Sequence, residues 1–114
     1  MLAKKNRVRK KKDFERILKG GEGFKEDFLI LKVKKNKSNK IRFGFIVAQK
    51  VSKKAVVRNK IKRRLREIVR LKMEEIKKGT EGVFITLPGI ETRDFREIES
   101  IVEKLFKKAG VLNL

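Results

Sequence analysis

Residues 50–72 combine dense positive charge with apolar residues at helical spacing. This segment contains eleven basic residues and a single acidic residue, Glu67. Its apolar positions and those just after it are three to five residues apart, at Val57, Ile61, Leu65, Ile68, Met73 and Ile76. Such spacing predicts an amphipathic helix rather than a disordered basic tail. A folded helix with so much positive charge implies a polyanionic partner of definite shape.

The charge of the whole chain points to the same kind of partner. Its 114 residues include 34 Lys and Arg against 14 Asp and Glu, a formal net charge of +20, and the pI is about 10.6. A pI above roughly 9 is typical of nucleic-acid-binding domains. Solubility alone requires a net charge of only about 2 to 8 in a small domain. We therefore expect a nucleic acid as partner and no small-molecule substrate.

Two chemically important residue types are missing, because the chain has neither cysteine nor histidine. A disulfide framework, a thiolate metal site and a thiol nucleophile are therefore excluded. No segment approaches the ~18 consecutive apolar residues of a membrane span, and the N-terminus lacks the apolar core of a secretory signal. We expect a cytoplasmic protein that does not act at a membrane.

The length suits one domain covering residues 1–114. Residues 1–8 are polar and basic, and we expect them to be mobile without a partner. A short helix should follow, capped by Asp13 or a nearby polar residue and ended by Gly20 and Gly21. One side of this helix carries Phe14, Ile17 and Leu18.

Two strands are expected after a loop through Gly23. Residues 28–33 and 41–47 are rich in apolar residues, and the polar run 35–40 between them predicts a hairpin turn. One face of the second strand suits a core and consists of Ile41, Phe43, Phe45 and Val47. The other face consists of Arg42, Gly44, Ile46 and Ala48. Its small residues would leave an open sheet surface if no helix covers it.

The second half of the chain predicts helix, strand and helix in turn. The basic helix should begin near Ala55 or Val56 and end before Gly79. Residues 83–87 predict a strand, and residues 91–108 predict a closing amphipathic helix capped at Thr92. The apolar positions of this last helix are Phe95, Ile98, Val102, Leu105 and Phe106.

Four polar residues of the basic helix project within about 60° of one another, opposite its apolar stripe. This polar ridge consists of Asn59, Arg63, Arg66 and Arg70. Lys62 lies beside the ridge, and Arg58 flanks it near the helix N-terminus, where free backbone N–H groups favour a phosphate. Arginine can hold a phosphate through two bonds, and asparagine can both donate and accept at a base edge or a sugar hydroxyl. A solvated charged face is the alternative, but Glu67 alone is available to neutralise the segment.

The same helix and the residues before it carry a dense set of residue types at fixed positions. The set comprises Arg58, Asn59, Lys62, Arg63, Arg66 and Glu67, preceded by Val47-Ala48-Gln49-Lys50 and by Ala55-Val56. It resembles the signature of the bacterial ribonuclease P protein subunit, and the order of elements resembles that family along nearly the whole chain. Two positions depart from the pattern, since Lys60 stands where the family has arginine and Gln49 where serine or lysine is usual. Lys60 keeps the charge but loses the bidentate geometry of arginine.

The resemblance implies both a fold and a function. The implied fold is α+β, a two-layer α/β sandwich with a small, mostly antiparallel sheet and the long basic helix in a left-handed βαβ crossover (ribosomal protein S5 domain 2-like). The implied function is that of the protein subunit of ribonuclease P, which binds the catalytic RNA and the single-stranded 5′ leader of precursor tRNA. Endonucleolytic removal of the leader then gives the mature 5′ end. The catalytic centre is expected on the RNA, with no catalytic residue, metal site or strongly bound cofactor on this chain and Mg²⁺ serving the holoenzyme.

The resemblance also assigns residues to two RNA-binding surfaces. The surface for the RNA subunit comprises Lys50, Lys53, Lys54, Arg58, Asn59, Lys60, Lys62, Arg63, Arg66 and Arg70. A groove between the first helix and the open sheet face would hold the leader through Arg9, Lys10, Phe14, Leu18, Lys32, Lys34 and Arg42. Phe14 supplies either a stacking surface, worth roughly 1 to 3 kcal/mol per base, or ordinary core packing. Phe28 and Phe84 are further aromatic candidates, for which core packing is favoured.

Other functions fit the residues less well. A protein-only nuclease would need clustered carboxylates for metal ions, whereas Asp13, Asp27 and Asp94 are isolated in the sequence. A helix-turn-helix protein would need a short helix and a tight turn before its recognition helix, and the β-rich segment before Ala55 argues against this. A basic ribosomal-type RNA-binding protein would share both charge and fold class, and it is the main alternative.

Overall fold

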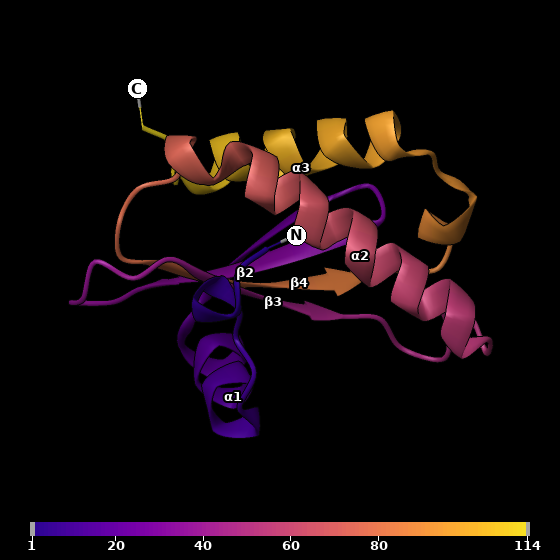
Figure 1. Cartoon of the computed structure of the whole chain (residues 1–114), viewed down its shortest axis with the longest axis horizontal. Helices are drawn as coiled ribbons and strands as arrows, with labels where there is room; N and C mark the ends of the chain where they lie inside the picture. The colour runs from indigo at the N-terminus through magenta and orange to yellow at the C-terminus, as the bar shows by residue number, and fades with distance from the viewer. Residues whose placement is uncertain (1, 114) are drawn as a thin grey trace.

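Four strands form one mixed sheet, with two long helices on one face and a shorter helix on the other (Figure 1). The computed structural model describes residues 2–113. Its elements are α1 (Lys11–Gly20), β1 (Glu22–Glu26), β2 (Leu29–Lys35), β3 (Arg42–Ile46), α2 (Ala55–Lys72), β4 (Thr80–Thr86) and α3 (Phe95–Ala109). Short 3₁₀ turns occur at Lys4–Asn6, Met73–Glu75 and Ile90–Thr92. Within the described residues, no helix is long and apolar enough to cross a membrane.

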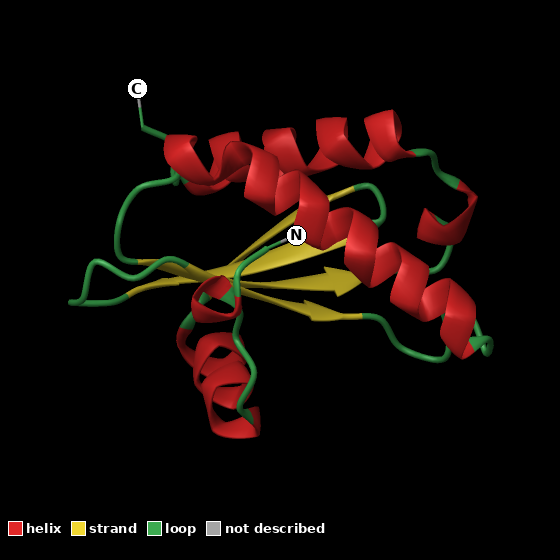
Figure 2. Ribbon diagram, in the orientation of Figure 1, coloured by secondary structure: helices red, strands yellow, loops and turns green. Residues whose placement is uncertain are grey.

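The strand order in the sheet is β1-β2-β4-β3, so the last strand in sequence lies between β2 and β3 (Figure 2). Strand β4 is antiparallel to β2 and parallel to β3, while β1 and β2 are antiparallel. The predicted pairing of residues 28–33 with 41–47 as a hairpin is therefore wrong. The polar run between these strands instead carries the chain across β4.

The hairpin that does form joins β1 and β2, where a loop through Gly23 was expected. Its register pairs Glu26 with Leu29, so the turn consists of Asp27 and Phe28. Asp27 adopts a positive φ of 46°, a conformation that aspartate tolerates better than most residues. Strand β1 was not predicted because it is a polar, largely exposed edge strand, in which no alternating apolar pattern marks a buried face.

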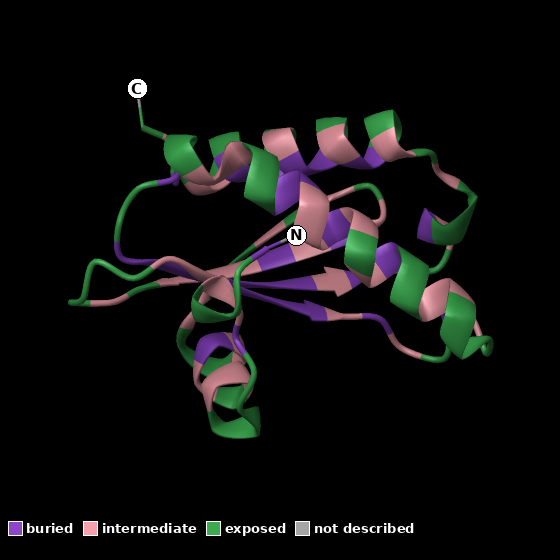
Figure 3. Cartoon of the chain, in the orientation of Figure 1, coloured by how far each residue is buried: buried purple, intermediate pink, exposed green. Residues whose placement is uncertain are grey.

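The main core fills the space between the sheet and helices α2 and α3 (Figure 3). Phe43, Phe84 and Phe106 meet at its centre, with ring centroids 5.6 to 5.8 Å apart. The apolar stripe predicted for α2 is confirmed at Ile61 and Leu65, which are 2% and 0% exposed. Phe84 is fully buried, as favoured for it.

Helix α3 begins later than expected and uses a different cap. Asp94 accepts a hydrogen bond from the Glu97 backbone, and the Glu97 side chain accepts one from the Asp94 backbone, which makes a capping box. The predicted cap at Thr92 is wrong, because its hydroxyl donates to the Gly89 carbonyl within the preceding turn. Helix α2 begins at Ala55, one of the two predicted starts, although its α-helical part ends at Lys72.

A second, smaller apolar cluster lies under α1 on the opposite face of the sheet. Val8, Ile17 and Val83 are its buried members. Helix α1 comes close to the sheet at Gly44, since a Cβ at this position would lie 2.5 Å from the Phe14 ring. The sheet face that the sequence left open is thus partly covered by α1.

The N-terminal segment, for which residues 1–8 were expected to be mobile, contains two buried apolar residues. Leu2 is 1% exposed and belongs to the main core, whereas Val8 belongs to the smaller cluster. Between them, Arg7 forms an isolated β-bridge with Phe43, and the Asn6 side chain donates a 2.8 Å hydrogen bond to the Ile41 carbonyl. The described part of this segment therefore adds to both clusters.

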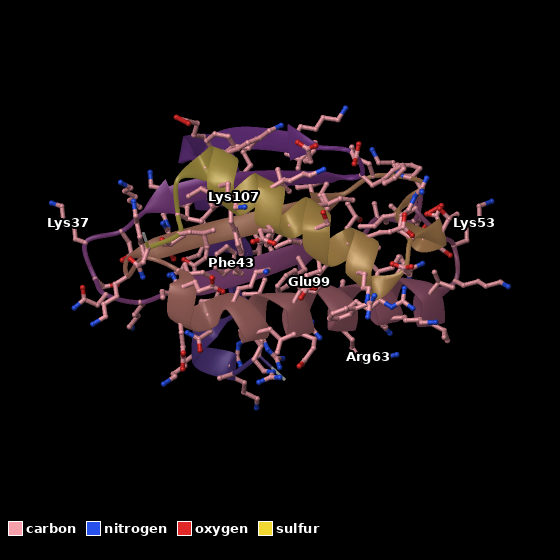
Figure 4. All side chains as sticks on the ribbon, turned by 90° about the horizontal axis from the view of Figure 1, so that it is seen from above. Lys37, Phe43, Lys53, Arg63, Glu99 and Lys107 are labelled. Carbon is pink, nitrogen blue, oxygen red and sulfur yellow. The ribbon has the colours of Figure 1, made fainter. Side chains whose placement is uncertain are left out.

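Helix α2 makes the crossover between the parallel strands β3 and β4. Parallel neighbouring strands require such a connection because the chain must return to the starting end of the sheet, which a tight turn cannot do. When the sheet is viewed from the side of α2 and α3, with β3 and β4 running upward, β4 lies to the left of β3 (Figures 1 and 4). The crossover is left-handed, as expected and against the usual preference.

Candidate nucleic-acid interface

The polar ridge lies on the outer side of α2. Asn59, Arg63 and Arg70 are exposed and Arg66 is partly buried, and Arg63 projects from the helix in Figure 4. Their side of the helix faces away from the sheet because Ile61, Leu65, Ile68 and Val69 on the other side are buried in the core. Packing of the apolar stripe therefore decides which charges face outwards.

One residue of the ridge has an acidic partner on the same helix. The Nε atom of Arg70 donates a 2.9 Å hydrogen bond to Glu67, three residues earlier. Hydrogen bonding to Arg70 lowers the pKa of Glu67, so this acid is ionised at neutral pH. Among the described residues, no ion pair engages Lys60, Arg63 or Arg66. The acid expected to neutralise the segment is thus used by Arg70.

Arg66 lies where positive charges crowd together. Burial lowers its pKa, and the neighbouring cations Arg7 and Arg63 lower it further. Its Nε atom is buried and has no hydrogen-bond partner among the described residues. Arg7 comes from the N-terminal segment, so the basic surface extends beyond α2, which the sequence did not indicate. An anion placed here would relieve this repulsion.

The loop before α2 presents three more lysines of the predicted set. Lys50, Lys53 and Lys54 are exposed, while Val51 between them is buried and anchors the loop. No side chain caps the N-terminus of α2, and its first turn contains no acid. The lysines and the helix N-terminus can therefore act on the same anion.

Arg58 has a structural role in addition to its charge. Its Nη1 atom donates 2.9 Å hydrogen bonds to the carbonyl oxygens of Ser52 and Lys53. These bonds tie the first turn of α2 to the loop before it. Arg58 thus shapes the lysine-bearing loop as well as flanking the ridge.

The predicted groove lies on the opposite face, between α1 and the sheet. Phe14 and Leu18 are both partly buried and pack against the smaller cluster, so Phe14 contributes to packing and also keeps part of its surface accessible. Lys32 and Lys34 lie on β2, on the sheet face opposite the buried Leu31. The Lys34 ammonium ends beside Gly20 at the C-terminus of α1, where the helix dipole favours a cation.

An ion network that the sequence did not reveal joins α1 to the sheet. Two nitrogens of Arg16 donate hydrogen bonds of 3.0 and 3.1 Å to the carboxylate of Glu81, whose side chain is 2% exposed. Arg42 also binds Glu81, with Nε at 3.0 Å, and Asp13 lies 3.5 to 3.6 Å from both arginines. Two cations and two acids therefore balance, and the Arg42 guanidinium predicted to contact phosphates is held in this network. In the sequence, only the position of Arg42 on the face of β3 opposite the core residues indicated a polar role.

The arginines control the ionisation of Glu81. Burial by itself would raise its pKa, but hydrogen bonds from Arg16 and Arg42 outweigh this effect, and the pKa lies below the ordinary value. The same contact raises the pKa of Arg16. Among residues 2–113, no three acidic side chains lie close enough together to hold a metal ion.

A basic cleft adjoins this network at the end of the sheet. It encloses about 1030 Å³ between the N-terminal segment, the connection from β2 to β3, and the residues after α2. Arg9, Lys10 and Arg42 of the predicted groove line it. Five other basic residues of its lining were not predicted, namely Lys4, Lys5, Arg7, Lys40 and Lys78.

The predicted residues thus lie on two basic faces of the molecule, which meet at Arg7, because this residue lies near Arg66 and also lines the cleft. The set assigned to the RNA subunit lies along α2 and the loop before it, and the set assigned to the leader lies on the α1 side of the sheet and in the adjoining cleft. Of the other aromatic candidates, Phe28 lies under the Arg93 guanidinium, 4.7 Å from the ring centroid, and lines a pocket together with residues of α3.

Known proteins resemble this chain over nearly its full length. The family model for ribonuclease P matches residues 2–110. A ribonuclease P protein component of Clostridium botulinum is 40% identical over 111 residues, which are 96% of this chain and 99% of the relative. The solved RNase P protein of Staphylococcus aureus superposes with a TM-score of 0.87 at 29% identity, covering 95% of this chain and 98% of that one. The RNase P protein of Thermotoga maritima gives a TM-score of 0.81 at 31% identity, covering 90% and 96%.

Proposed function

The chain belongs to the ribonuclease P protein family, and from this premise we propose that α2 binds the catalytic RNA while the α1 face of the sheet receives the 5′ leader of precursor tRNA. As a ribonuclease P protein component, the protein binds RNA and is part of the ribonucleoprotein enzyme that processes the 5′ end of tRNA. The alternative of a ribosomal-type protein is not favoured, since the family match covers residues 2–110.

The crowding of cations on α2 carries the proposal for the catalytic RNA. Arg63 lies close enough to Arg66 to lower the pKa of Arg66, and neither residue forms an ion pair with an acid among the described residues. A phosphate backbone supplies the missing negative charge and releases its own counterions on binding. The rigid α2, packed through Ile61 and Leu65, keeps these cations in a fixed arrangement that suits a structured RNA.

The opposite face supports contact with a single strand. Phe14 retains an accessible surface, and Lys32 and Lys34 lie on the same side of the sheet. Stacking on an aromatic ring and contacts to phosphates both tolerate any sequence, which suits leaders of differing sequence. Because Arg42 is bound to Glu81, the lysines and the adjoining cleft supply most of the charge in this groove.

The chemistry belongs to the RNA in this proposal. The protein binds and orients the precursor, which raises the affinity of the enzyme for leader-bearing substrate. Mg²⁺ serves the RNA rather than a site on this chain, and the reaction takes place in the cytoplasm.

Reconstitution tests the proposal. Catalytic RNA alone, protein alone and the two together are compared for cleavage of precursor tRNA at low Mg²⁺. We expect a gain in rate or substrate affinity only for the combination, and a protein with Arg63→Ala and Arg66→Ala should give a smaller gain. Specific cleavage by protein alone would overturn the proposal, as would an RNA whose activity is unchanged by the protein.

A further inference from the structure

A recess of about 480 Å³ lies between α2 and the first turn of α3. Its lining consists of Lys60, Arg63, Arg64, Arg66 and Glu67 from α2 and Phe95 from α3. We propose that this recess binds one unpaired nucleotide of the RNA partner, with the base against Phe95 and its phosphate on the cations of α2. The inference rests on the proposed function, because it names a contact within the docking of α2 on RNA.

The α2 wall of the recess is strongly positive. Its one acid, Glu67, is hydrogen-bonded to Arg70, which lies outside the lining. Arg64 donates a 3.2 Å hydrogen bond to the carbonyl of Arg93 and so joins α2 to the start of α3. Lys60 and Arg63 are exposed, and no ion pair among residues 2–113 engages them. These two cations are therefore available to a phosphate at the rim.

The α3 wall supplies a half-buried aromatic ring. Phe95 is the first residue of α3 and packs against the main core with one part of its surface. The capping box formed by Asp94 and Glu97 holds the helix start rigid, and it occupies the backbone amides of these two residues and places their carboxylates at the helix start. The ring is therefore fixed in position, and the cations that would bind an anion in the recess come from α2.

This combination suits a nucleotide better than a phosphate alone. The exposed lining of the recess is mainly carbon, with cations around it. The volume falls in the range of about 300 to 1,000 Å³ that is usual for small-ligand sites. Bases within an A-form helix are not accessible to such a recess, whereas an unpaired base can turn outwards and stack on an aromatic ring or a guanidinium plane. The occupant is thus an extruded nucleotide within the docked RNA.

The test compares the affinity of three variants for the catalytic RNA. Phe95→Leu removes the aromatic face but retains an apolar side chain, and Phe95→Tyr retains the ring. Phe24→Leu is the matched control, since Phe24 is another partly buried phenylalanine packed on the same core, on β1 and outside the recess. Thermal unfolding of each variant verifies the fold, and filter binding at several salt concentrations gives both the affinity and its salt dependence.

We expect Phe95→Leu to weaken binding by about 5- to 150-fold, the range of one base–aromatic stack. Its salt dependence should match that of the wild type because the lost contact is uncharged. Phe95→Tyr and Phe24→Leu should bind within about twofold of the wild type, and chemical probing should find one unpaired nucleotide whose protection disappears only with Phe95→Leu.

Three results would overturn the inference while the wild-type protein still binds the catalytic RNA. They are unchanged binding by Phe95→Leu, equal losses for Phe95→Leu and Phe24→Leu, and a loss for Phe95→Tyr as large as that for Phe95→Leu. Failure of the wild type itself to bind would instead contradict the proposed function. The two failures are therefore distinguishable.

Discussion

Arg16 of α1 and Glu81 of β4 form a doubly hydrogen-bonded ion pair, with N to O distances of 3.0 and 3.1 Å. Glu81 is 1% exposed and lies on a central strand, whereas Arg16 reaches it from a helix on the sheet surface. Together with Arg42 and Asp13, this pair fixes α1 on the sheet and so sets the shape of the groove.

Loss of the Glu81 carboxylate should destabilise the protein. We expect Glu81→Ala to lower the free energy of unfolding by about 3 kcal/mol, at the lower end for removing one partner of a buried pair, because both arginines can still reach water. Urea denaturation measures the change. Glu74→Ala is the control, since Glu74 is exposed. A loss no larger than that of the control would show that the network does not stabilise the fold.

Acidification should weaken the same contact. The pKa of Glu81 is lowered in the folded state from its ordinary value of 4.5, so its contribution to stability is complete above that value and is lost as pH falls through the folded pKa. We expect the wild type to lose stability on titration below pH 4.5 more steeply than Glu81→Gln does. Parallel stability curves for the two proteins would contradict this assignment.

A side chain at Gly44 should push α1 away from the sheet. The added Cβ of Gly44→Ala would lie 2.5 Å from the Phe14 ring, which is held in the smaller cluster and yields little. We expect a loss of about 1 to 3 kcal/mol in the free energy of unfolding, typical of overpacking, and weaker binding of leader-bearing precursor. Gly20→Ala is the matched control, because its Cβ would meet only the flexible end of Lys34. Equal effects of the two variants would exclude a special role of Gly44.

The two basic surfaces should separate in binding assays. Arg63→Ala or Arg66→Ala should weaken affinity for the catalytic RNA and reduce the slope of its salt dependence by about 1. Phe14→Ala or Lys32→Ala should leave that affinity unchanged and instead reduce the preference for precursor over mature tRNA. Binding of each variant to catalytic RNA, and of each holoenzyme to the two tRNAs, provides the measurements. Loss of catalytic-RNA binding by the groove variants would contradict the division.

Local pattern was reliable where each element carries its own signal. The apolar spacing from Val57 to Ile68 placed α2 and its buried stripe correctly, and the same kind of pattern placed α3. Strand β1 has no such signal, because an exposed edge strand buries little. The pairing of residues 28–33 with 41–47 failed because a single strand pattern does not specify its neighbour.

By itself, the sequence determined the net charge, which is a sum over residues wherever they lie, and also the amphipathic basic helix and the family signature, since these two depend on residues within about twenty positions of one another. Only the tertiary structure decided that β4 separates β2 from β3, that α1 covers Gly44, and that Glu81 holds Arg16 from 65 positions away. It also decided that Phe95 lies beside the cations of α2. Such contacts depend on how distant segments pack, and packing follows from the shape and burial of the whole chain rather than from any local pattern.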